Sequence, residues 1–431
     1  MKSFLARRHL QPKRSDLTRR ASNTFSYLND GFTDKEVICM FDAQALHDVP
    51  REASEYISRN KEATNYYTSI AGESSLLSAL SQLAHEKNLE HIETENILIT
   101  AGAINGFSAV CSAICEDGDV ILALSPSYIL LANSPELFGA TMELVPSIRR
   151  NKFSTDPETI RDTICRLQNE GKNVKALVVV NPTNIDGQCW TNGEIQSIAP
   201  IIEEFNLLLI EDRVYDGTQF AAPHDASFFG EHPEIKKRTI TIDSVSKRFG
   251  ATQWRVGWVF ADSAITKAAR EFVMQSVWSP NALFQRATAT MINASLHTSS
   301  TTWAKEYLNN TQSEYKRRRD LCLLLIDGLE RYNSQREQRR ATLSEELLQR
   351  YSRELSGCVI HHTGTPHISA PILPQAGMFL LIEFSQAIWS ALPRELPYPD
   401  LAFARFLYLQ EKVVMLPPSE LTLPDEAQLF R

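Results

Sequence analysis

The sequence predicts an α/β protein whose central sheet is mostly parallel and lies between helices. Short β-branched and aliphatic runs alternate with helical patterns through the middle of the chain, as they do in parallel α/β domains. The runs are almost wholly apolar, which is typical of strands covered on both faces. A chain of 431 residues, of which 43% are hydrophobic, is long enough to form two or three structural units.

Six strands and one crossover helix are predicted in order along the chain. The helix follows the third strand, where Thr191 and Glu194 have the spacing of a capping box and apolar residues from Ile195 to Ile202 fall on one face. Pro200 lies inside this helix and removes one hydrogen bond, so we expect some loss of straightness. The predicted strands are Ile97 to Thr100, Val120 to Leu124, Ala176 to Val180, Leu207 to Ile210, Thr239 to Ile242 and Val256 to Phe260.

The composition changes after about Ser313, where the chain becomes highly charged up to Arg353. This change predicts exposed helices that connect a large domain to a smaller one, with the run KRRR as a solvated helix face. The segment GMFLLIEF then predicts a buried strand of the smaller domain. We therefore divide the chain into an amino-terminal arm with part of the small domain (1–55), a large domain (56–315) and a carboxyl-terminal small domain (316–431).

The bulk composition favours small-molecule chemistry in the cytoplasm. A formal charge of −8 gives no electrostatic reason to expect a nucleic-acid partner. No apolar stretch is long enough to cross a bilayer, so no membrane partner is expected. The basic first 14 residues could be an organelle transit peptide, but a solvated arm is the preferred interpretation. Adjacent His361 and His362 could ligate a metal, although no metal is predicted. The seven cysteines show no disulfide or zinc-site spacing.

Polar residues follow the predicted strands, where ligands collect in open parallel sheets. Asn181 follows the third strand, Asp212 the fourth, and Ser244, Ser246 and Lys247 the fifth, while Arg255 precedes the sixth. Each of these residues alone would be ordinary, because lysines at strand ends usually lie on the surface and aspartates there usually cap turns. Together, and in this order along the chain, they indicate a binding site at the ends of the strands. The motifs are TAGA from Thr100, SPSY from Ser125, NPTN from Asn181, DRVY from Asp212 and SVSKRFGATQWRVG from Ser244.

This set of motifs resembles the pyridoxal-phosphate-dependent class I/II aminotransferases of fold type I, which include aspartate aminotransferase and enzymes similar to 1-aminocyclopropane-1-carboxylate synthase. The resemblance is strong from about Tyr66 to Phe260. It implies a large cofactor-binding domain with a mostly parallel seven-stranded sheet between helices, and a smaller α/β domain. It also implies pyridoxal 5'-phosphate as the cofactor and an amino acid as the substrate.

The resemblance implies a role for each polar residue. Lys247 would form the Schiff base with the cofactor and move the α-proton of the substrate. Asp212 would keep the pyridine nitrogen protonated. Asn181 and Tyr215 would hydrogen-bond the phenolate oxygen, with Asn181 also facing the substrate, and Tyr128 would stack on the ring. The phosphate would be held by the helix-opening amides of Gly102, Ala103 and Ile104, by Ser244 and Ser246, and by Arg255.

Two further residues are implied at the edges of the site. Tyr67, with Tyr66 as the competing choice, would reach the phosphate of a neighbouring subunit, which implies a homodimer with shared active sites. Arg431 is the candidate for binding the substrate carboxylate, since a guanidinium suits that group. The alternative is that Arg431 is an ordinary charged residue at the end of the sequence, with no role in binding.

The chain departs from the family pattern at one turn and near its end. NPTNIDG replaces NPxNPxG, and no PGxxF follows Val413. Amino transfer through an external aldimine and a quinonoid is the leading hypothesis. The alternative is a specialised lyase, cyclase or oxidase of natural-product biosynthesis that uses the same intermediates. A non-catalytic binding module is disfavoured because the cofactor residues are all present. The substrate side chain is not predicted.

Overall fold

The centre of the protein is a seven-stranded sheet, as expected from the resemblance. All neighbouring strands are parallel except β10, which runs antiparallel to both of its neighbours. The six predicted strands all exist, and the sheet adds one edge strand that was not predicted. In spatial order the strands are β2 (Ile97–Thr100), β10 (Gly257–Phe260), β9 (Thr239–Ser244), β8 (Leu208–Asp212), β7 (Asn173–Val180), β3 (Asp119–Leu124) and β4 (Thr141–Val145).

The computed structural model describes most of the large unit and part of the rest of the chain. The described residues are 38–39, 45, 47–61, 67–149, 153–154, 156–220, 227–300, 303–339, 364–391, 400, 403–404, 406–407, 413–415 and 429–430.

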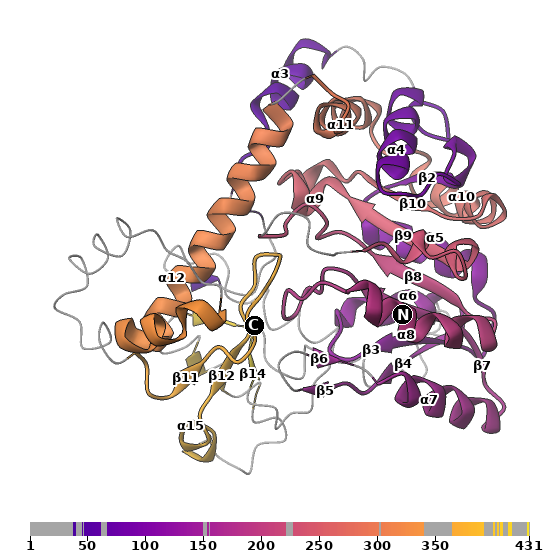
Figure 1. Ribbon diagram of the computed structural model, residues 1–431. Coiled ribbons are helices and arrows are strands. Elements are labelled where there is room, and N and C mark those ends of the chain that lie inside the picture. Colours follow the sequence, from indigo (N-terminus) through magenta and orange to yellow (C-terminus); the bar gives the residue numbers. More distant parts are fainter. Residues whose placement is uncertain are drawn as a thin grey trace, which may run out of the picture.

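Helices cover both faces of the sheet, because alternate strand residues point to opposite sides. On one side Ile121 packs with α5 (Ala103–Ile114) and α10 (Ser263–Val277). On the other side Leu122 packs with α7 (Pro157–Asn169) and α8 (Asn192–Glu204). A further apolar cluster joins the β2 end of the sheet to α4 (Ser74–Glu86) and α11 (Ala282–Ser295), with α3 (Arg51–Arg59) nearby (Figure 1).

The predicted crossover helix is confirmed as α8. Thr191 caps it, since its hydroxyl accepts a hydrogen bond from the Glu194 amide at 3.3 Å while the Glu194 carboxylate accepts from the Thr191 amide at 2.9 Å. Pro200 stays inside the helix. The remaining short elements of the large unit are α6 (Asn133–Leu137), α9 (Val245–Arg248), β5 (Ile148–Arg149), β6 (Phe153–Ser154) and the 3-10 helices η3 (Thr94–Asn96), η4 (Ile129–Ala132), η5 (Phe229–Glu231), η6 (Lys236–Arg238) and η7 (Thr252–Trp254).

A long helix, α12 (Trp303–Arg339), runs from α3 and α11 to a second, smaller sheet (Figure 1). Gly328 interrupts its helical geometry with φ 73° and ψ 164°. The smaller sheet contains β11 (Ile368–Ser369), β12 (Ile382–Phe384) and β14 (Leu429–Phe430), and it is antiparallel. Nearby elements are α15 (Gln386–Ala391) and the parallel pair β1 (Ile38–Cys39) and β13 (Val413–Val414). The domain boundary expected near residue 315 stays a prediction.

Two expectations for this region need correction. The strand expected over GMFLLIEF is shorter, because Gly377 is held by Thr218 of the large unit instead of by a strand partner. The KRRR run is not uniformly solvated. The Arg319 side chain is only 8% exposed, because it donates to the Pro374 carbonyl at 2.7 Å and lies 4.9 Å from the Phe220 ring centre.

The segment from Leu373 to Gly377 joins the second unit to the loops that follow β7 and β8. The carbonyl of Gly187 accepts hydrogen bonds from the amides of Gln375 and Ala376, both at 2.9 Å. The Gln188 side chain donates to the Leu373 carbonyl at 2.7 Å. Gly377 completes the attachment by donating to the Thr218 hydroxyl at 3.0 Å. The position of both loops therefore depends on a segment that is 185 residues away in sequence for the Gln188 bond and 159 for the Thr218 bond.

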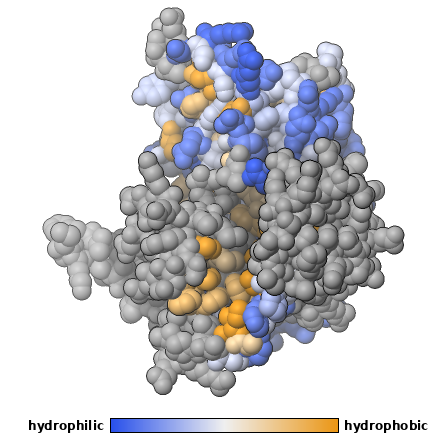
Figure 2. Space-filling model, turned by 90° about the vertical axis from the view of Figure 1, so that its left-hand side faces the viewer, coloured by the Kyte–Doolittle hydropathy of each residue, from blue (hydrophilic) through white to orange (hydrophobic). Residues whose placement is uncertain are grey.

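Figure 2 shows the face of the molecule that lies on the left-hand side of Figure 1, and this face is hollowed. Hydrophilic residues cover the upper part of this face, and hydrophobic residues gather in the recessed area below it. Within the described ranges, no helix has both the length and the apolar character that crossing a membrane requires.

Candidate active site

The amino terminus of α5, with the Arg255 guanidinium beside it, is the candidate anion cradle. Gly102 precedes the helix with φ 86°, and a Cβ on it would collide with the Arg255 guanidinium. Gly257 is required for the same reason, because a Cβ there would lie 2.7 Å from the Gly102 carbonyl carbon. The first-turn amides of Ala103 and Ile104 have no partner within the helix. The structure therefore brings Arg255 to the helix end where phosphate is predicted to bind.

Arg255 itself keeps donors available. It is exposed and adopts the left-handed conformation with φ 52°. Its Nη1 donates to the Thr252 carbonyl and its Nη2 to the Ala101 carbonyl, both at 3.0 Å. A guanidinium has five donors. The remaining donors can reach an anion at the helix terminus.

Asp212 and Lys247, the two residues predicted at the centre of the site, lie close enough to interact electrostatically. Burial raises the pKa of the Asp212 carboxyl to about 6, although the Val214 amide and the positive charge of Lys247 both lower it. The Val214 amide donates to Asp212 Oδ1 at 3.1 Å and so fixes the carboxylate. A half-buried carboxylate with a raised pKa gains from a cation that comes to lie beside it.

Ser244 caps the short helix α9, which contains both Ser246 and Lys247. Both serines are buried, and the Ser244 hydroxyl accepts from the Ser246 amide at 3.3 Å as the cap of α9. Their hydroxyl hydrogens remain donors that can point toward the α5 terminus.

The two tyrosines predicted at the site are partly or fully covered. Tyr215 is 3% exposed, and its ring centre lies 6.3 Å from that of Phe379. Tyr128 is half-buried beside the α5 face.

The structure does not support the role predicted for Asn181. This residue is fully buried, and its Nδ2 donates to Glu211 Oε1 at 3.1 Å and to the Ser227 carbonyl at 2.9 Å. Its Oδ1 accepts from the Trp190 amide at 3.2 Å. Both amide hydrogens are therefore used inside the protein, and none is left for a cofactor or substrate.

Asn184 is the asparagine that the sequence analysis missed. It lines a pocket at the carboxyl ends of β3 and β7, whereas Asn181 does not. The signal was present, since NPTN contains two asparagines three residues apart. The second one, Asn184, lies in the turn after β7 and lines the pocket.

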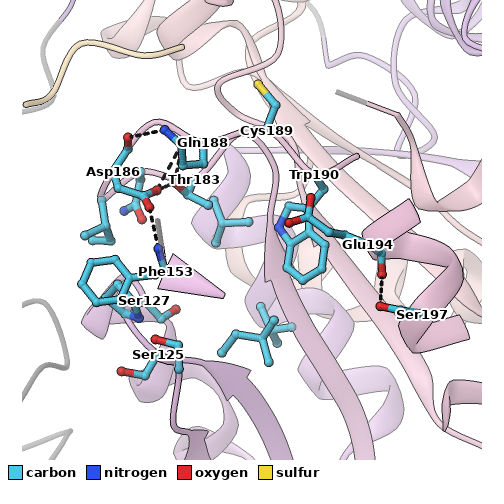
Figure 3. A pocket seen from close by; sticks show the side chains of 17 residues that line it. Ser125, Ser127, Phe153, Thr183, Asp186, Gln188, Cys189, Trp190, Glu194 and Ser197 are labelled. Atoms are coloured by element: carbon cyan, nitrogen blue, oxygen red, sulfur yellow. Dashed lines mark hydrogen bonds between the residues drawn. The ribbon is translucent and has the colours of Figure 1, made fainter. Parts of the chain in front are cut away.

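The pocket beside Asn184 has a volume of about 800 Å³, including space open to solvent. Figure 3 shows Thr183, Asp186 and Gln188 together on one side of it, with Trp190 and Glu194 on the other. Its further lining residues are Leu124, Ser125, Pro126, Ser127, Ser147, Phe153, Val178, Val180, Ile185, Cys189 and Ser197.

Asp186 closes the turn in which this chain departs from the family pattern. Its carboxylate accepts from the Thr183 hydroxyl, from the Gln188 amide at 3.2 Å and from the Phe153 amide at 3.4 Å (Figure 3). Burial raises the pKa of this carboxyl despite those hydrogen bonds. The departure thus replaces a proline-fixed turn with one fixed by a carboxylate.

The outer residues of the predicted site are placed only in part. Tyr67 is 91% exposed, and its ring centre lies 6.1 Å from that of Trp278. Tyr66, Arg431, His361 and His362 lie outside the described residues. Among the residues that are described, no group of three or more potential ligands could hold a metal ion.

Comparison with known proteins identifies the family. A family model described as aminotransferase class I and II matches residues 38–431. An aspartate/prephenate aminotransferase of Thermus thermophilus is 25% identical over 283 residues, which are 65% of this chain and 69% of that protein. A protein named "Probable kynurenine–oxoglutarate transaminase" from Saccharomyces cerevisiae is 24% identical over 421 residues, which are 93% of this chain and 78% of that one.

Solved structures share the fold. Bna3p of Saccharomyces cerevisiae matches with a TM-score of 0.73 at 20% identity, covering 99% of this chain and 93% of its own. A double mutant of Thermus thermophilus aspartate aminotransferase matches with a TM-score of 0.72 at 20% identity, covering 99% and 94%. These relatives favour transamination over elimination, cyclisation or oxidation. The chain belongs to the class I and II aminotransferases, and it is a pyridoxal-phosphate-dependent aminotransferase of fold type I.

Proposed function

We propose that this enzyme transfers the amino group of an α-amino acid to a 2-oxo acid at the carboxyl edge of the sheet, where Lys247, Asp212 and Arg255 hold the cofactor. The observation that carries the proposal is that these three groups meet at one edge. The charge of Lys247 acts on Asp212, and the Arg255 guanidinium lies over the terminus of α5. An amine, a buried carboxylate and an anion cradle are the groups that pyridoxal phosphate needs.

The donors at the α5 terminus fit the phosphate. The amides of Gly102, Ala103 and Ile104, the hydroxyls of Ser244 and Ser246, and the free donors of Arg255 would bind it. The absence of a side chain at Gly102 lets the backbone approach the anion closely.

The opposite end of the site fits the pyridine ring. Bound pyridoxal phosphate supplies an electron sink for the substrate carbon that loses its proton. Asp212 would pair with the protonated ring nitrogen, which offsets the energy of burying its charge. Tyr215 would donate to the phenolate oxygen, with Asn184 in place of Asn181, and Tyr128 would cover one ring face.

Lys247 would bind the cofactor through its Nζ atom and then, as a free amine, move the proton of the substrate α-carbon. The role of Arg431 in binding the substrate carboxylate stays a prediction. The relatives act on aspartate and prephenate or on kynurenine according to their names. We extend to this chain only the reaction that these names have in common, which is amino transfer, and not the substrates that they mention.

A second copy of the chain would cover the exposed apolar side chains near the phosphate cradle. Tyr67 and Trp278 touch while 91% and 45% exposed, and Ile104, in the first turn of α5, is 47% exposed. Large apolar side chains exposed in pairs favour a protein interface. We propose a homodimer in which Tyr67 reaches the phosphate site of the partner copy.

We also propose that the enzyme works in the cytoplasm, where thiols stay reduced. The support is that Cys111, Cys115, Cys165, Cys189 and Cys322 are all free thiols.

The reaction class is tested by mass spectrometry of products from a panel of amino acids, with and without a 2-oxo acid acceptor. We expect a 2-oxo acid product, and a new amino acid formed from the acceptor in equal amount. Turnover that proceeds unchanged without an acceptor would show that transamination is the wrong assignment.

The variant Lys247→Ala should lose the visible absorbance band of the covalently bound cofactor, because it has no amine at that position. Its kcat should fall by at least about 10²–10⁴-fold, the usual contribution of a proton-transfer group. The matched control is Lys237→Ala, since Lys237 is an exposed lysine of η6. If the band survives in Lys247→Ala, another residue holds the cofactor.

The variant Asp212→Asn should weaken cofactor binding while stabilising the cofactor-free protein. The raised pKa of Asp212, about 6, means that the cofactor-free protein loses stability as the pH rises from about 4 to about 6, and the loss persists at higher pH. The variant should therefore gain about 1–3 kcal/mol of unfolding free energy near pH 8 and little near pH 4. Urea unfolding at both pH values measures this, with the exposed Asp162→Asn as control. Equal gains at both pH values would contradict the ionisation argument.

The dimer is tested by sedimentation. The wild-type enzyme should show twice the chain mass of 48.7 kDa, and Trp278→Glu should shift it toward the monomer, because a charge replaces a buried interface aromatic. Phe406→Glu is the control, since Phe406 is also exposed, at 53%, but lies in the smaller unit. A fully active monomeric wild type would exclude a shared site.

A further inference from the structure

A buried network of alternating charges lies beneath the active site. Arg248 Nη2 donates to Asp216 Oδ2 and to Asp243 Oδ2, both at 2.8 Å, and Arg248 Nε donates to the Asp216 carbonyl at 3.2 Å. Arg213 Nη2 donates to the other oxygen of Asp216 at 2.8 Å, and its Nη1 donates to Glu211 Oε1 at 3.2 Å. The network thus joins the ends of β8 and β9 through side chains that are at most about 6% exposed.

Each network residue is next to a proposed site residue in the sequence. Glu211 and Arg213 flank Asp212, Asp216 follows Tyr215, and Arg248 follows Lys247. Adjacent residues in a strand or short helix point in different directions. One member of each pair therefore faces the cofactor site, while the other is fixed in the network below it.

The helix that carries Lys247 needs an external anchor. α9 contains only four residues, and the Phe249 amide bonded to the Val245 carbonyl at 3.2 Å closes its single turn. One turn of helix is unstable by itself. Arg248 ends α9, and its side chain lies across Gly217, where a Cβ would be 3.0 Å from Arg248 Cγ. Arg248 is thus packed against the same turn that its guanidinium binds.

We propose that Arg248 is a positioning residue for Lys247, acting by bridging Asp216 of the β8 loop and Asp243 of β9. The bridge sets the rotation of α9 and therefore where the Lys247 amine lies relative to Asp212 and Tyr215. This inference rests on the proposed role of Lys247. Arg248, Asp216 and Asp243 would act in this way without touching substrate or cofactor.

The charges of the network support a fixed geometry. Burial by itself would raise the pKa of Asp216, but Lys87, Arg213 and Arg248 outweigh burial and hold that pKa well below its usual range. Asp216 is therefore ionised and binds both guanidinium groups at neutral pH. Arg213 is further held by the Phe228 ring, whose centre is 3.6 Å from its guanidinium carbon.

The decisive variant is Arg248→Lys in the holoenzyme, because lysine keeps the charge but its compact ammonium lacks the planar fork with which Nε and Nη2 of Arg248 reach separate acceptors. We expect kcat to fall by about 10–100-fold, the effect of a displacement of about 1 Å at a reacting group. The KM should stay within about twofold of the wild-type value, and the visible circular dichroism of the bound cofactor should change. Asp243→Asn, which keeps an acceptor oxygen but removes a charge, should change the same observables less.

Lys175→Met is the matched control. Lys175 Nζ lies 3.6 Å from Oδ2 of the buried Asp119. Both residues are near the amino ends of their strands, β7 and β3, whereas the proposed site is at the carboxyl ends. This variant should lower thermal stability without changing kcat or the circular dichroism. The proposal is overturned if Arg248→Lys lowers only thermal stability, as the control does, and keeps wild-type kcat and circular dichroism. Retention of the cofactor band in Lys247→Ala would instead overturn the assignment of Lys247.

Discussion

Asp216 is shared by two buried guanidinium groups, and the arrangement of the active site depends on that sharing. Arg213 binds one carboxylate oxygen and Arg248 binds the other, each at 2.8 Å. The two arginines follow different strands, so a single carboxylate ties the end of β8, where Asp212 lies, to the helix that contains Lys247. Removing one partner of such a buried pair leaves an uncompensated charge, which is strongly destabilising.

The same low-dielectric environment prepares the site for a cationic ring. Burial raises the pKa values of Glu211 and Asp243 to about 7 and that of Asp212 to about 6, since water no longer stabilises their charges. Glu211 and Asp243 have arginine partners within the protein. Asp212 interacts with the charge of Lys247, and a protonated pyridine nitrogen would add a second positive charge beside it. The carboxylates of the network are thus paired with arginines of the protein, whereas Asp212 would also pair with the cofactor.

The sequence predicted most of the sheet and the places of Asp212 and Lys247 relative to its strands, because both depend on local patterns. Apolar runs ending in polar residues placed Asp212 and Lys247 at strand ends, and the structure puts them there. The role given to Asn181 is not supported, because its side chain bonds within the protein, and Asn184 was not considered. Which asparagine lines the pocket depends on the path of a turn that Asp186 and the distant segment 373–377 determine. Arg319 was misplaced on the surface for a similar reason, as Phe220 and Pro374 cover it. The edge strand β4 mixes polar and apolar residues and was missed.

The shared carboxylate also constrains how this enzyme can change during evolution. A substitution at position 213, 216, 243 or 248 leaves a buried charge at another of these positions, so single steps pass through destabilised proteins. Functional descendants should therefore exchange the four residues as compatible sets. Grafting the DRVYD loop into another aminotransferase would, by the same reasoning, require Asp243 and Arg248 to be moved with it.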